Sequence, residues 1–246
     1  MKGSLVWLVS LAAAPLLSQP LWAQDGPVAS LSGNVAIISD YTFRGISQTQ
    51  DELAIQGGMD LSAPHGLYAG VWGSNLNFGE DIGVGRAQAE MDVYGGIAPS
   101  LAGTDLDLGF VYYGYPGSEQ SFNYGFLEFG VGASRALGPL SLGVSAKYSP
   151  DFFAASGTGI YLGGALSAVL PSTPVTLSGS LGHQSIEDNA AFGTPDYLDW
   201  AAGLSAAVFG LDLGATYVDT NLSRDECFGG SDLCASRAVF SVGLGL

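Results

Sequence analysis

The chain carries little charge, and very little of that charge is positive. Charged residues make up 12% of the 246 residues, with 7 Lys and Arg against 23 Asp and Glu, and the formal net charge is −16. Proteins that bind nucleic acid neutralise its phosphates with Lys and Arg, and surfaces that bind anionic lipid are also basic. The composition therefore predicts no nucleic-acid partner and no basic membrane-binding surface.

Cysteine and histidine are also scarce, with two residues of each. Cys227 and Cys234 lie in the polar segment Cys-Phe-Gly-Gly-Ser-Asp-Leu-Cys, and no His is close to them. Zinc sites need more ligands at suitable spacing, whereas paired cysteines in an exported protein form disulfides. We therefore predict a disulfide, no metal site and no cofactor. The acidic loop residues that could bind calcium lack the spacing of an EF-hand.

Long apolar runs are missing beyond the N-terminus. Lys2, the apolar stretch Leu5–Leu17 and the small residue Ala23 predict a secretory signal peptide over residues 1–23. An N-terminal membrane anchor is the alternative, but two prolines interrupt the segment, and the stretch is short for a span of about 20 residues. No later window is apolar enough for a membrane helix, so we expect a single β-barrel domain over residues 24–246.

In place of long apolar runs, the chain has alternating apolar and polar residues. Near the C-terminus, every second residue from Phe240 to Leu246 is apolar, and these residues share one face of a predicted strand. The same pattern near the start of the domain places Tyr41 and Phe43 on the apolar face of another strand. Twelve strands are predicted in this way. Their ranges are 33–44, 53–62, 66–76, 86–97, 104–114, 123–136, 140–149, 159–170, 174–184, 197–209, 210–219 and 236–246.

The predicted connections alternate in length, as they do in outer-membrane barrels with short periplasmic turns and longer external loops. An even number of strands also closes a barrel without an exposed edge. We therefore predict an all-β fold, a transmembrane antiparallel up-and-down β-barrel in the outer membrane of a Gram-negative bacterium. The short turns are 63–65, 98–103, 137–139, 171–173 and the region around Gly210, and the long loops are 45–52, 77–85, 115–122, 150–158, 185–196 and 220–235.

A soluble β-sandwich or a periplasmic barrel would also show alternating strands. Three features argue against it. The faces opposite the apolar ones are rich in Gly, Ser and Ala, where a dry core would need larger side chains. Charged residues such as Glu90 and Glu128 lie in the middle of strands. Tyr and Phe are frequent near strand ends, as in the aromatic belts of membrane proteins.

The segment Ser39-Asp40-Tyr41-Thr42-Phe43-Arg44-Gly45-Ile46-Ser47-Gln48-Thr49 resembles the start of the proteobacterial TorF family of porins, a family of conserved hypothetical outer-membrane proteins. Residues 66–75 and 90–96 are similar to further motifs of that family. The resemblance implies an outer-membrane barrel with a porin-like role and no characterised substrate. Its partners would be outer-membrane lipid and the barrel-assembly machinery, although the chain ends in Leu246 where an aromatic residue is usual.

We expect a narrow channel for ions or small solutes, because twelve strands lie between filled barrels of about eight strands and open barrels of about sixteen. A surplus of inward acids predicts a preference for cations. One alternative is a structural barrel in which inward Arg residues pair with acids and plug the lumen. Another is a barrel whose acidic external loops serve adhesion or complex assembly. The predicted lumen-lining residues are Asp40, Arg44, Asp60, Arg86, Glu90, Asp92, Asp105, Asp107, Glu128, Lys147, Asp199, Asp212 and Arg237.

A lipid hydrolase is a more remote alternative, since some twelve-stranded barrels cleave lipids. Such chemistry needs a nucleophile and a base within hydrogen-bond reach. His183 and Ser185 form one candidate pair, but no Gly-x-Ser-x-Gly elbow surrounds the serine. We therefore predict that the protein is not an enzyme.

Overall fold

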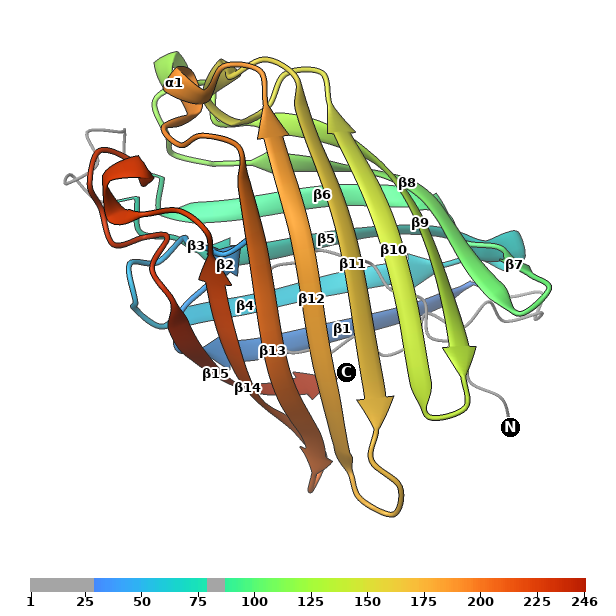
Figure 1. The fold of residues 1–246 in the computed structure, drawn as a ribbon. Helices are drawn as coiled ribbons and strands as arrows, with labels where there is room; N and C mark the ends of the chain where they lie inside the picture. The colour runs from blue at the N-terminus through green and yellow to red at the C-terminus, as the bar shows by residue number, and fades with distance from the viewer. Residues whose placement is uncertain (1–28, 79–86) are drawn as a thin grey trace.

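The computed structural model describes residues 29–78 and 87–246, which form a closed antiparallel barrel of twelve long strands (Figure 1). Each long strand pairs with its neighbours in sequence, and the first long strand pairs with the last. The long strands are β1 (Ser30–Ile38), β4 (Ala54–Ser62), β5 (Leu67–Asn75), β6 (Ala89–Ile97), β8 (Thr104–Gly114), β9 (Phe126–Leu137), β10 (Leu140–Ser149), β11 (Gly159–Val169), β12 (Val175–Ile186), β13 (Tyr197–Val208), β14 (Leu211–Thr220) and β15 (Arg237–Gly245).

The outer face of the barrel is apolar along every long strand. In β10, Leu142 and Val144 point outward and are 44% and 65% exposed, whereas Ser145 and Lys147 are half-buried. The period of two in the sequence produces this arrangement, because successive side chains point to opposite faces of a strand. A closed barrel with an apolar exterior satisfies its backbone hydrogen bonds internally and can span a bilayer. The predicted fold class is confirmed.

The connections differ in length at the two ends of the barrel, and Figure 1 shows α1 (Asn189–Phe192) among the longer ones. At one end lie the short turns 63–66, 98–103, 138–139, 170–174 and 209–210. At the other end, the long-loop end, lie 39–53, 115–125, 150–158, 187–196, 221–236 and the described part of 76–88. The predicted alternation is therefore confirmed for the described connections.

Short elements occupy parts of these connections. They are β2 (Thr42–Phe43), β3 (Ile46–Ser47), β7 (Ser100–Leu101) and the 3₁₀ turns Pro64–Gly66, Gln120–Phe122, Phe153–Ala155 and Arg224–Glu226. Within the described ranges, no helix has both the length and the apolar character needed to cross a membrane.

The barrel closes between β1 and β15, as the alternating pattern of the terminal strand predicts. The paired residues run from Asn34 with Gly245 to Ile38 with Ser241. Beyond the ladder, the N–H of Ser39 donates to the carbonyl of Phe240 at 2.8 Å, and the terminal Leu246 exchanges two further bonds with the other strand. The closure leaves no open edge on either terminal strand.

The prediction of a first strand over residues 33–44 is wrong at its C-terminal end. The strand stops at Ile38, and residues 39–53 turn into the barrel as a segment that we call the inward loop. Tyr41, predicted on the lipid face, is 1% exposed inside the barrel, and Phe43 also packs inside. Arg44 and Gly45 make the turn with positive φ angles of 49° and 83°. A Cβ at residue 45 would overlap the side chain of Thr220, so only glycine fits there.

The strand predicted over residues 86–97 begins later, at Ala89, and Ala87 lies buried before it instead of on the outer face. Arg86, predicted to line the lumen, lies outside the described residues.

The apolar exterior predicts a strong effect of charge in the middle of β10. The substitution Val144→Arg should lower the free energy of unfolding by about 2–4 kcal/mol, because arginine near the bilayer midplane loses its hydration. Phe209→Arg, at a fully exposed turn residue, is the matched control and should change little. Guanidinium unfolding in phospholipid vesicles measures both. Equal effects of the two substitutions would contradict an apolar belt facing lipid.

Candidate functional site

The inward loop is held inside the barrel by a buried arginine. The Nη2 atom of Arg44 lies 2.8 and 2.7 Å from the two carboxylate oxygens of Glu128 on β9, and Nη1 donates to Gln184 on β12. Arg44 and Glu128 are each 2% exposed. The guanidinium also lies 4.2 Å from the ring centre of Tyr161 on β11. These contacts come from three strands across the barrel, so the loop crosses the interior and is fixed to the opposite wall.

The acid Asp40 fixes the start of the inward loop. Its carboxylate accepts hydrogen bonds from the hydroxyls of Ser47 and Thr49, both at 2.7 Å. It also pairs with Arg237 of β15 at 2.7 Å, and Arg237 pairs in turn with Asp51 at 2.7 Å. The predicted residues Asp40 and Arg237 therefore meet, but Asp40 lies in the loop and not on a wall strand.

A third contact fixes the loop to β6. The hydroxyl of Tyr41 donates to Glu90 at 3.1 Å, and the Tyr41 ring packs edge-on against Trp72 of β5 at 5.4 Å. Glu90 and Asp92 lie two residues apart on the same face of β6 and are both buried. The loop thus contacts walls on opposite sides of the barrel.

Tyrosine hydroxyls donate to three of the remaining predicted acids. Tyr94 donates to Asp60. Tyr68 donates to Asp107 at 3.0 and 3.1 Å, and Tyr161 donates to Asp199 at 3.3 Å. Asp105 lies on β8 and accepts a hydrogen bond from the hydroxyl of Ser100. Asp212 lies on β14, and the predicted base Lys147 lies on β10. The sequence interpretation named the acids and missed these tyrosine donors.

Inward glycines make room for the tyrosine rings. A Cβ on Gly182 of β12 would overlap the ring of Tyr161, so the ring position depends on glycine at that site. The small residues of the inner face therefore partly serve to seat aromatic side chains.

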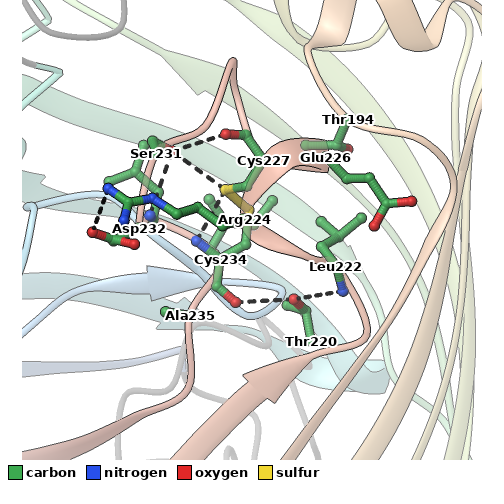
Figure 2. The surroundings of a disulfide bond; sticks show 12 residues. Thr194, Thr220, Leu222, Arg224, Glu226, Cys227, Ser231, Asp232, Cys234 and Ala235 are labelled. Atoms are coloured by element: carbon green, nitrogen blue, oxygen red, sulfur yellow. Dashed lines mark hydrogen bonds and ion pairs between the residues drawn. A yellow bond between two sulfur atoms is a disulfide. The ribbon is translucent and has the colours of Figure 1, made fainter.

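The predicted disulfide is present between Cys227 and Cys234, and Figure 2 shows its surroundings. Thr220 donates to the carbonyl of Cys234 at 3.0 Å, which ties the disulfide-bonded loop to the end of β14. The carbonyl of Leu233 accepts the N–H of Ser47 at 2.9 Å. The disulfide-bonded loop therefore contacts the inward loop directly.

The segment that leads into the disulfide-bonded loop is stabilised by a local cap. Glu226 accepts hydrogen bonds from the hydroxyl and the N–H of Ser223, at 2.7 and 2.9 Å. These two bonds favour the charged carboxylate and hold the pKa of Glu226 below its usual value.

The candidate catalytic pair is not assembled among the described contacts. Ser185 donates its hydroxyl to Asp196 at 2.8 Å, and His183 lies exposed on the outer face of β12. In the described parts of the chain, no three His, Cys, Asp or Glu residues are grouped as metal ligands.

The sequence of the whole barrel matches a family model over residues 23–244, and the chain belongs to this family, described as a bacterial protein of unknown function, Gcw_chp. The more specific TorF assignment remains a prediction. No curated protein matches the chain.

The chain aligns with solved porin structures. The NanC porin aligns with a TM-score of 0.55 at 13% identity, over 87% of this chain and 98% of that one. Salmonella typhi OmpF in complex with daunomycin aligns at 0.48 and 11% identity, over 90% and 98% of the two chains. The outer-membrane channel DcaP of Acinetobacter baumannii aligns at 0.46 and 11% identity, over 89% and 97%. The NanC similarity identifies the architecture as a porin-type barrel.

The buried pair predicts a strong thermodynamic coupling. Arg44→Met should lower the free energy of unfolding by about 3–5 kcal/mol, because it leaves the Glu128 carboxylate buried without its partner. The double variant R44M/E128M should recover at least about half of that loss. The exposed pair Arg224–Asp232 is the matched control, and its removal should cost about 0–1 kcal/mol. Additive effects of the two substitutions at 44 and 128 would contradict the coupling.

The disulfide predicts an effect on the inward loop as well as on stability. Replacing both cysteines by serine should lower the free energy of unfolding by about 2–3 kcal/mol, as the entropy of a loop of this length suggests. Amide hydrogen exchange should accelerate at Ser47, whose N–H bonds to Leu233, and stay unchanged in the middle of β9. Unchanged exchange at Ser47 would show that the disulfide-bonded loop does not hold the inward loop.

Proposed function

We propose that this protein is an outer-membrane, porin-like channel for ions or small solutes, in which the inward loop forms the constriction. The observation that carries the proposal is a closed barrel with an apolar exterior and a polar, small-residue interior. Ser, Gly and Asp dominate the inner faces, and a polar interior is what a water-filled passage requires. The predicted signal peptide over residues 1–23 and assembly by the barrel-assembly machinery belong to the same proposal.

The orientation follows from the loop lengths. In outer-membrane barrels the short turns face the periplasm and the long loops face outward. The inward loop would then narrow the external half of the barrel, and the Tyr94–Asp60 and Tyr68–Asp107 pairs would line the periplasmic half.

Arg44 and Glu128 are almost fully buried, which supports a constriction that is closed at Arg44 while this pair is formed. Solutes would pass when the inward loop moves away from β9. Breaking a buried ion pair is costly, so the closed state would dominate and openings would be brief.

Cation preference is the expected selectivity. Asp60, Asp107 and Asp212 lie on inward faces away from the Arg44 pair. Among the described residues, the other predicted bases of the interior form ion pairs with acids, and Lys147 is the one that does not. Rings of carboxylates favour cations in aqueous pores.

A non-conducting barrel that serves structure or adhesion is the second candidate. The same buried ion pair favours it, because Arg44 and Arg237 pair with acids as a permanent plug would require. A measurement of conductance across a bilayer distinguishes the channel from the non-conducting barrel.

Single-channel recording in planar bilayers tests the proposal. Wild-type protein should give rare openings, and R44M/E128M should raise the open probability several-fold without leaving a buried charge. Arg135→Ala, at an exposed arginine near the short-turn end, should leave the recordings unchanged. In a KCl gradient, D60N/D107N should reduce the preference for K⁺ over Cl⁻. Folded wild type and R44M/E128M without channel events would contradict a channel, and anion preference would contradict the acidic lumen.

A further inference from the structure

A cavity of about 360 Å³ lies at the long-loop end of the barrel, between the inward loop and the other long loops. We call it the aromatic vestibule. Its main lining side chains come from six separate connections or strand ends. They are Phe43, Phe78, Tyr115, Phe153, Phe192 and Phe228.

The lining of the vestibule carries no charged side chain among the described residues. This is unusual here, because the surrounding loops are rich in Asp and Glu, including Glu119, Asp151 and Asp188. A charged molecule entering the vestibule would lose water and find no counter-charge. The cavity therefore suits a neutral molecule.

The arrangement of the rings suits an aromatic molecule. Phe153 lies nearly perpendicular to Phe78 and to Phe192, with ring centres 5.9 and 6.3 Å apart, and Phe192 meets Phe228 edge-on at 5.6 Å. Rings set edge-to-face present both positive edges and negative faces, so a further ring can pack favourably among them. The volume falls within the range of about 300–1,000 Å³ that small-molecule sites occupy.

Two amide side chains, Gln48 and Asn77, interrupt the apolar lining. Their side-chain nitrogens already donate within the protein, so the amide oxygens are the groups that can accept from a hydroxyl or amino substituent on the ring. One aromatic lining residue also belongs to the inward loop, since the Phe43 ring lies 4.6 Å from the guanidinium carbon of Arg44. A molecule in the vestibule would touch the loop that forms the constriction.

We propose that the aromatic vestibule binds a neutral aromatic small molecule of the phenol type. This binding site adds a class of ligand to the proposed channel. It depends on the proposed function in one respect, the side of the membrane from which the ligand enters.

Fluorine NMR with 4-fluorophenol as the probe tests the binding, with the barrel in lipid nanodiscs and empty nanodiscs as the lipid background. The signal should show saturable broadening with the barrel, and unlabelled phenol should reverse it. Phe192→Ala and Phe228→Ala should each weaken binding roughly three- to tenfold, because each removes one ring contact. Phe209→Ala, at a fully exposed phenylalanine of a short turn, is the matched control and should bind as wild type does.

Three results would overturn the inference. They are broadening no greater than in empty nanodiscs, equal affinity in the vestibule variants and wild type, and equally tight binding of 4-fluorobenzoate, which carries a charge. Heat-dependent gel mobility confirms that each variant is a folded barrel. The binding measurement does not depend on flux through the barrel, so the two proposals can fail separately. Saturable binding to a barrel that never conducts supports the vestibule as a binding site and contradicts the channel. Conduction without binding supports the channel and contradicts the binding site.

Discussion

A sheet that crosses a membrane must leave no backbone N–H or C=O unpaired, and here that requirement is met where β1 pairs with β15. The closure joins segments about 200 residues apart in sequence, including the bond between Ser39 and Phe240. It forces the number of long strands to be even and the connections to fall alternately at the two ends. It also divides every strand into a lipid face and an interior face, so the interior must satisfy its own polar groups.

The interior does so in two different ways. In the half near the short turns, tyrosine hydroxyls donate to carboxylates two strands away in the wall, as Tyr94 of β6 does to Asp60 of β4. Such contacts stay within the wall. In the other half, wall tyrosines contribute as well, since Tyr161 donates to Asp199, but further partners of the wall carboxylates come from the inward loop, through Arg44 and Tyr41. The wall there is complete only when the loop is in place, because Glu128 without Arg44 would be a buried charge. One half of the lumen is thus lined by the barrel itself, and the other half is closed by a segment that is not part of the sheet.

The barrel could be predicted from sequence because it depends on a local signal. The period of two marks the lipid face of each strand, and Gly and Pro mark the turns. The inward loop could not be predicted in this way. Residues 39–44 continue the alternation of the strand before them, so Tyr41 and Phe43 have the pattern of lipid-facing residues. What turns them inward is contact with Glu128 and Gln184, which lie 84 and 140 residues from Arg44. The acids of the lumen could be named from their faces, but their tyrosine donors lie two strands away, so each pair depends on the register of the strands between them.

The segment that carries the family resemblance is also the segment whose contacts are the most specific. A lipid-facing residue needs only to be apolar, and an inner-wall residue needs mainly to be small or polar. The inward loop instead needs an arginine that reaches two oxygens of Glu128, a glycine at a positive φ beside Thr220, and hydroxyls at residues 47 and 49 for Asp40. None of these residues belongs to the ladder between β1 and β15, which pairs residues 34–38 with residues 241–245. They serve to hold one segment across the lumen, which is what the proposed constriction requires of buried charged residues.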